Sequence, residues 1–199
     1  MSMSARTSSA PSPASVNSNR WSTKQLVTMA LMCAISLVLS FIEFSIIPAA
    51  PFLKLDISLM PCAVVGFAYG PGPGIIVGVV SAVGHAVITG NWVGALMNII
   101  VTVAFVGVSS LLYKKFHTFK GAIAALAIAA VVMIAAAAVA NIIVDPIFYG
   151  IPLQTVLDLM VWIVVFNIIK SVVIAILTAL IYKSISNLIT PEKLQVKGR

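Results

Sequence analysis

The sequence predicts an all-α integral membrane protein with six transmembrane helices and both termini on the cytoplasmic side. Of its 199 residues, 61% are hydrophobic and only 9% are charged, whereas a soluble globular domain carries about a quarter charged residues. The apolar runs often continue for about 20 residues, as a spanning helix requires. They lack the alternating polar positions of a transmembrane β-barrel, so we expect one helical bundle.

Composition divides the chain into three parts. Residues 1–22 are rich in Ser, Ala, Pro and Asn and predict a disordered cytoplasmic tail. No apolar segment with a cleavage site follows directly, so we expect no cleaved signal peptide. Residues 23–186 form the predicted six-helix membrane domain, and residues 187–199 form a basic cytoplasmic tail.

The predicted spans cover residues 24–47, 57–69, 74–88, 92–113, 122–144 and 157–182. A tight turn at residues 70–74 and a loop at residues 146–155 separate neighbouring spans. The second span is short: at about 1.5 Å per residue it covers roughly 20 Å of a roughly 30 Å core. We therefore expect the stretch before it to dip inward, which is permitted only where backbone is buried in protein or lines a cavity.

The stretch before the second span, PAAPFLKLDISLMP at residues 48–61, contains two charged residues between apolar segments. It lies away from the basic segments of the chain. Pro48 and Pro51 favour an ordered loop over a helix, because proline fixes its own backbone and biases the residue before it toward extended forms. Lys54 and Asp56 lie two positions apart within this loop. We expect the loop to cap a ligand cavity that opens to the outside.

The basic residues predict the orientation in the bilayer. Ten of the 12 Lys and Arg residues lie in the two tails, at the adjoining ends of the first and last spans, or in the loop at residues 114–120, and six spans bring these places to one side. The positive-inside rule makes that side the cytoplasm. Orientation thus accounts for the net charge of +7, and we expect no nucleic-acid partner. Four acidic residues fall on the outer side: Glu43, Asp56, Asp145 and Asp158, of which the first is expected to face interfacial water.

Lys170 is the strongest single indication of a site. It lies near the middle of the last predicted span, where a lysine costs several kcal/mol unless it faces a polar interior. Asn167 lies three residues earlier on the same helix face. The alternative is a purely structural ion pair with Asp158, Asp145 or Glu43.

Other spans add hydrogen-bonding side chains to the outer half of the bundle. His85 lies near the outer end of the third span, Asn98 in the fourth and Asn141 in the fifth. A lone histidine there is more often an interfacial or hydrogen-bonded residue than a ligand. Because asparagine offers both donors and acceptors, the set suits a polar, largely uncharged ligand with an apolar body. The expected binding residues are Lys54, Asp56, His85, Asn98, Asn141, Asn167 and Lys170.

The same residues argue against enzymatic function. No Ser/His/Asp arrangement, mid-span carboxylate pair or metal cluster is visible in the sequence, and without a Walker motif any ATP dependence must come from a partner. Cys33 and Cys62 are expected to be packing residues. Ala30 and Ala34 place two small residues on one helix face, which permits close approach of another helix, although from the spacing alone ordinary alanine use is the favoured explanation.

In their order and spacing these segments resemble the substrate-binding S components of energy-coupling factor (ECF) vitamin transporters, most closely the riboflavin type. The resemblance covers about residues 24–186. It rests on FIEF at 41–44, APFLKLD at 50–56, Pro61, the Gly-Pro turn at 70–71, His85, Asn98, Asn141 with Pro146 and Tyr149-Gly150, and FNIIK at 166–170.

The resemblance implies the six-helix S-component fold in the cell membrane and capture of riboflavin from outside. Riboflavin would be the transported substrate, with no cofactor. The implied partners are a membrane coupling subunit and two cytoplasmic ATPases, with Ala30 and Ala34 as the docking motif.

Two departures keep alternatives open. Ser81-Ala82 stands where riboflavin members often carry a Lys-Asn pair, and Ser45 stands where proline is common. The alternatives are an S component for thiamine, pantothenate or a flavin analogue, and beyond these an intramembrane enzyme or a structural subunit.

Overall fold

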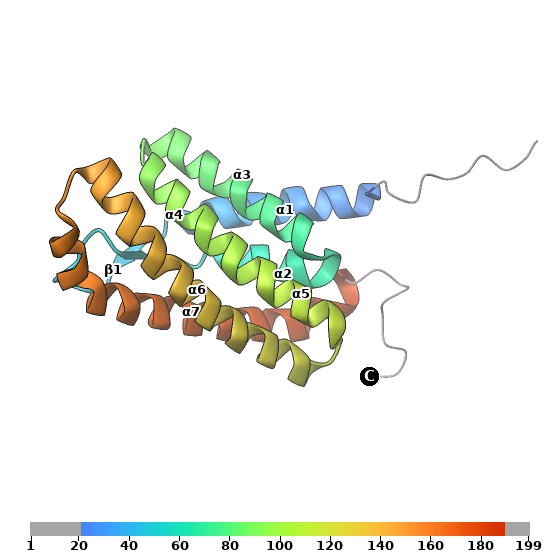
Figure 1. The fold of residues 1–199 in the computed structure, drawn as a ribbon. Coiled ribbons are helices and arrows are strands. Elements are labelled where there is room, and N and C mark those ends of the chain that lie inside the picture. Colours follow the sequence, from blue (N-terminus) through green and yellow to red (C-terminus); the bar gives the residue numbers. More distant parts are fainter. Residues whose placement is uncertain (1–20, 190–199) are drawn as a thin grey trace, which may run out of the picture.

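The computed structural model describes residues 21–189, and within them the side chains of residues 21–181. Helices run up and down a single bundle, and a short hairpin lies at one end of it (Figure 1). In chain order the elements are α1 Thr23–Ser40, β1 Phe44–Ser45, β2 Lys54–Leu55, α2 Leu59–Tyr69, α3 Pro71–Thr89, α4 Trp92–Thr102, the π-helical segment η1 Val103–Gly107, α5 Val108–Lys115, α6 Phe119–Tyr149 and α7 Leu153–Ile189.

Five helical segments of the described chain are long and apolar enough to cross a membrane. They are Thr23–Ser40, Pro71–Thr89, Trp92–Lys115, Phe119–Tyr149 and Leu153–Ile181. The third of them is continuous because η1 joins α4 to α5. The prediction of six spans is therefore confirmed for five by length and composition, and the sixth, α2, is a shorter apolar helix.

The shortness of α2 follows from its place in the bundle. All of its residues from Leu59 to Ala68 are buried, so it lies among the other helices rather than against lipid. Its neighbours include α1, α3, α5 and α7. A helix of 11 residues is only about 16 Å long. The hairpin and its loop directly precede this short helix, where the sequence predicted an inward-dipping segment.

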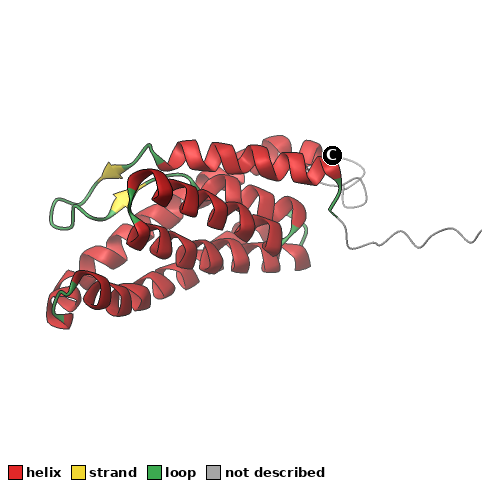
Figure 2. Ribbon diagram, turned by 90° about the horizontal axis from the view of Figure 1, so that it is seen from above, coloured by secondary structure: helices red, strands yellow, loops and turns green. Residues whose placement is uncertain are grey.

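The predicted end of the first span is wrong. Helix α1 ends at Ser40 rather than at residue 47, and the chain then forms an antiparallel hairpin in which Phe44 pairs with Leu55 and Ser45 with Lys54. The residues after Ser40 are mostly apolar, and hydropathy alone does not separate an apolar helix from an apolar extended segment. Figure 2 shows the hairpin at the end of the helices.

Two other boundaries also differ from the prediction. The turn predicted at residues 70–74 is confined to Gly70, whose positive φ of 97° suits glycine, and α3 begins at Pro71. The loop predicted to begin at Pro146 begins later, because α6 continues for one turn to Tyr149 and is capped by Gly150, whose φ is 64°. Proline removes one helical hydrogen bond there but does not end the helix.

The hairpin and the connection that follows Lys114 and Lys115 lie at opposite ends of the bundle. Helix α1 begins and α7 ends at the same end of the bundle, and the hairpin lies at the other end (Figure 1). The connection between α5 and α6, which follows Lys114 and Lys115, lies at the end where α1 begins. The start of α1, the end of α7 and the connection between α5 and α6 thus lie at one end of the described bundle.

Candidate functional site

A cavity lies under the hairpin and extends between α4, α6 and α7. The volume available to the centre of a water molecule is about 130 Å³. Its wall contains all seven residues predicted to bind a ligand: Lys54, Asp56, His85, Asn98, Asn141, Asn167 and Lys170. Apolar side chains complete the lining, among them Phe52, Leu53, Met97, Val101 and Phe166. A few polar groups in an apolar wall are typical of a small-molecule site.

Lys170 is held by a buried ion pair at the centre of this cavity. Its Nζ donates to Asp56 Oδ2 at 2.9 Å and to Asn98 Oδ1 at 3.3 Å. The ammonium and carboxylate side chains are only 7% and 8% exposed. The alternative of a structural pair with Asp158, Asp145 or Glu43 named the wrong carboxylates, because the partner is Asp56.

Asp56 is positioned by the start of α2. Its Oδ1 accepts hydrogen bonds from the backbone N–H of Ser58, at 2.9 Å, and from the Ser58 hydroxyl. This local loop geometry is common for aspartate. Burial alone would raise the pKa of Asp56, but the Lys170 charge and the Ser58 hydrogen bonds together outweigh it, and the pKa lies below the ordinary value. The carboxylate therefore links the hairpin to α7.

Lys54 forms a second ion pair at the mouth of the cavity. It donates to Glu43, which precedes the first strand of the hairpin, and their side chains are 50% and 28% exposed. Glu43 is thus partly exposed and paired at the cavity mouth. Pairing across the hairpin satisfies both charges without any contact to Lys170.

The three asparagines leave hydrogen-bonding capacity for a ligand. Asn141 donates to the Ala137 carbonyl at 2.7 Å, and Asn167 donates to the Ile163 carbonyl at 2.8 Å, each four residues back on its own helix. Each side-chain oxygen of these two amides has no donor among the described residues. Lys170 has three N–H donors and uses two on Asp56 and Asn98. The wall thus offers both donors and acceptors to a bound molecule.

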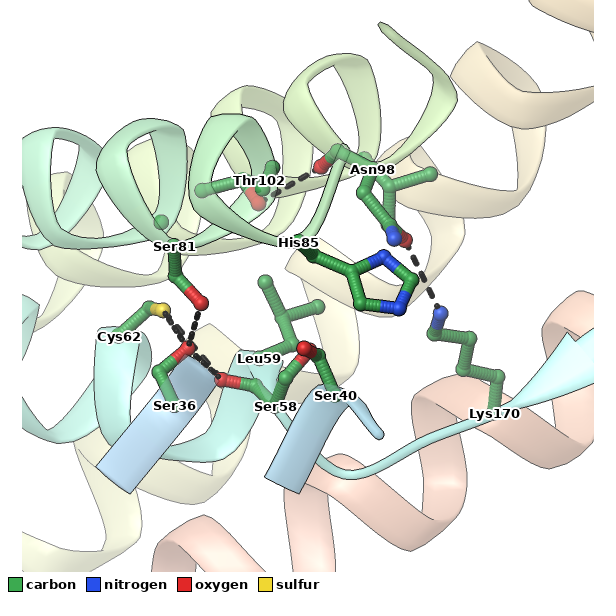
Figure 3. A pocket seen from close by; sticks show the side chains of 13 residues that line it. Ser36, Ser40, Ser58, Leu59, Cys62, Ser81, His85, Asn98, Thr102 and Lys170 are labelled. Carbon is green, nitrogen blue, oxygen red and sulfur yellow. Dashed lines mark hydrogen bonds between the residues drawn. The ribbon is translucent and has the colours of Figure 1, made fainter. Parts of the chain in front are cut away.

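His85 marks the inner edge of the cavity and the start of a smaller polar hollow of about 20 Å³ (Figure 3). Its ring is buried and lies 4.9 Å from the ring of Phe41, centroid to centroid. Beyond it, the Ser36 hydroxyl lies within hydrogen-bonding distance of the Ser58 carbonyl, at 2.8 Å, and of the Ser81 hydroxyl, at 2.9 Å. This network connects α1, α2 and α3 behind the site.

Sequence reasoning missed part of the wall that α6 contributes. Ala137, Asn141, Asp145 and Tyr149 all line the cavity, and they recur at intervals of four residues on one helix face. Only Asn141 was assigned to the site from the sequence. The four-residue spacing was the signal that could have identified Asp145.

Ala30 and Ala34, predicted to form a docking motif, lie outside the cavity. Both are exposed on α1, among large apolar side chains that are also exposed, including Leu31, which is 58% exposed, and Val38, which is 63% exposed. This outward face of α1 leaves room for close contact with another helix.

Comparisons with known proteins agree with one another. A family model described as "ECF transporter, substrate-specific component" matches residues 24–182. The riboflavin transporter RibU of Staphylococcus aureus is 31% identical over 177 residues, which cover 85% of this chain and 94% of that protein. The riboflavin transporter FmnP of Bacillus subtilis is 27% identical over 173 residues, covering 80% and 90%. A solved structure of the S component of a bacterial ECF transporter matches with a TM-score of 0.76 and 32% identity, covering 84% of this chain and 98% of that one.

Proposed function

The chain belongs to the family of substrate-specific components of ECF transporters, which are multi-pass membrane proteins and not enzymes, and from this premise we propose that its cavity binds riboflavin for import. The observation that carries the proposal is the meeting of seven hydrogen-bonding residues from the hairpin, α3, α4, α6 and α7 in one cavity with apolar walls. Two relatives that match over most of the chain are riboflavin transporters.

The chemistry of riboflavin matches the cavity wall. The isoalloxazine ring has an apolar dimethylbenzene end and a polar edge with carbonyls, ring nitrogens and one N–H, and the ribityl chain adds hydroxyls. The apolar side chains of Phe52, Met97 and Phe166 enclose the ring in this proposal. The remaining N–H of Lys170 donates to the polar edge or to a hydroxyl, and the free amide oxygen of Asn141 accepts from an N–H or O–H.

Orientation and partners complete the proposed transport cycle. The basic residues at the end of the bundle opposite the hairpin favour cytoplasmic termini, so the cavity opens to the outside and captures riboflavin there. A membrane coupling subunit and two cytoplasmic ATPases then drive release inward, since no ATP-binding motif occurs in this sequence. The exposed small residues Ala30 and Ala34 supply the surface on which the coupling subunit docks.

Titration of the purified protein with riboflavin, followed by quenching of flavin fluorescence, tests the proposal. We expect submicromolar affinity for the wild-type protein and a large loss for Lys170→Met. Lys115→Met is the matched control, because Lys115 is exposed and is the last residue of α5, which ends away from the hairpin. A folded wild-type sample that fails to bind riboflavin below the micromolar range refutes the riboflavin assignment. Mass spectrometry of the molecule that copurifies would then identify the vitamin.

A further inference from the structure

Asp145 is a buried carboxylate that faces the cavity without a protein partner. Its residue surface is 5% exposed, and it lines the cavity together with Asn141, one turn earlier on α6. Among the described residues it has neither a hydrogen bond nor an ion pair. A buried carboxylate without a partner is costly, so such a group is a strong indication of a missing ligand donor.

The local helix structure does not offset this charge. Asp145 lies in the last turns of α6, where the helix dipole presents its negative end and disfavours a carboxylate. No basic residue occupies the last turn of α6. A hydrogen-bond donor held in the cavity would offset the cost of burying this charge.

The other charged groups of the cavity wall are already paired. Lys54 pairs with Glu43, and Lys170 pairs with Asp56. With His85 counted as neutral, Asp145 leaves the cavity wall of the described chain with one excess negative charge. An uncharged ligand with O–H or N–H donors satisfies this carboxylate, whereas an anionic ligand is repelled by it.

We propose that Asp145 is a specificity-determining residue that selects uncharged flavin over phosphorylated flavin. The carboxylate accepts a hydrogen bond from an O–H or N–H of the bound flavin and repels a phosphate group. The inference rests on the proposed riboflavin binding and adds to it the discrimination between riboflavin and flavin mononucleotide. Rejection of a ligand by charge can be distinguished from rejection by size, because a neutral ester at the position of the phosphate adds bulk without charge.

The first test compares Asp145→Asn with the wild-type protein. Dissociation constants for riboflavin and for flavin mononucleotide are measured by fluorescence quenching. We expect the ratio of the mononucleotide constant to the riboflavin constant to fall about tenfold in Asp145→Asn, the order of effect of one partly shielded charge. The riboflavin constant itself changes less, because the amide oxygen still accepts a hydrogen bond. Asp158→Asn is the matched control, since that carboxylate is exposed, bonded to Gln154 and absent from the cavity wall.

A second test needs no variant and holds even if Asp145→Asn fails to fold. The wild-type protein is titrated with riboflavin 5′-acetate, an uncharged ester, beside the mononucleotide. The proposal expects the ester to bind at least about tenfold more tightly than the phosphate. Two outcomes overturn the role of Asp145 and leave the proposed riboflavin binding intact. One is equal rejection of the ester and the phosphate. The other is an unchanged ratio of the mononucleotide constant to the riboflavin constant in a folded Asp145→Asn protein that still binds riboflavin. A wild-type protein that binds no riboflavin overturns the proposed function and this inference together.

Discussion

The ion pair between Asp56 and Lys170 makes a sharp prediction about stability. Asp56→Asn removes one charge but keeps the side-chain oxygen that accepts from Ser58, so the start of α2 is preserved. At a separation of 2.9 Å, an effective dielectric constant of about 20 gives an attraction of about 6 kcal/mol between the two charges. Desolvation offsets most of that attraction while the pair is intact.

Removal of one partner leaves the other charge buried without compensation. Lys170 retains only Asn98 as an acceptor among the described residues, and loss of a buried partner costs about 3–5 kcal/mol. For a chain of this size we expect the midpoint of thermal unfolding to fall by roughly 10 °C, at about 2–4 °C per kcal/mol. The midpoint is measured in detergent without ligand.

A second ion pair provides the control. Glu43→Gln makes the same chemical change in the pair with Lys54, whose side chain is 50% exposed. An exposed pair contributes about 0–1 kcal/mol, so the midpoint should change by no more than about 4 °C. The double variant Asp56→Asn with Lys170→Met removes both buried charges and should regain most of the lost stability without regaining flavin affinity. An Asp56→Asn protein that loses no more stability than Glu43→Gln refutes the reasoning.

Three further predictions concern docking, ligand contacts and pH. Ala30→Trp and Ala34→Trp should each abolish uptake in cells while leaving flavin binding by the purified protein unchanged, since bulk blocks helix approach; normal uptake in both variants removes the docking role. Asn141→Leu and Asn167→Leu should each weaken riboflavin binding about 10- to 100-fold, because a buried ligand group loses its partner; unchanged affinity by fluorescence quenching argues against contact. The lowered pKa of Asp56 contributes stability that is present above its ordinary value of 3.8 and is lost as the pH falls through the lower folded-state value. The acid-induced fall in unfolding midpoint should therefore be steeper in the wild-type protein than in Asp56→Asn, and equal slopes contradict this.

Much of the site could be predicted because polar side chains in apolar spans face the protein interior or a cavity rather than lipid. Lys170, Asn141 and Asn167 are too costly to face lipid, so each was expected to point inward, and the structure brings them to one cavity. The partner of Lys170 could not be chosen in the same way. Several carboxylates were expected in the outer half, and the actual partner lies 114 residues away in a loop whose path the spans do not determine.

The boundaries that differed have local physical causes. Phe41 to Ile47 is mostly apolar, and its extended hairpin conformation depends on pairing with residues that follow the loop. Pro146 was read as the end of a helix, but α6 tolerates the loss of one hydrogen bond within its last turn. The π-helical segment Val103–Gly107 carries no proline and no distinctive pattern that would have predicted it.

The central claim is that a flavin occupies the cavity between the hairpin, α4, α6 and α7. An experimental structure of the protein with riboflavin tests it most directly. The account predicts the flavin in this cavity, with polar atoms within hydrogen-bonding distance of Lys170 and of the amides of Asn141 and Asn167. A flavin bound elsewhere, with Lys170 and Asp56 still paired beside an empty cavity, would contradict it.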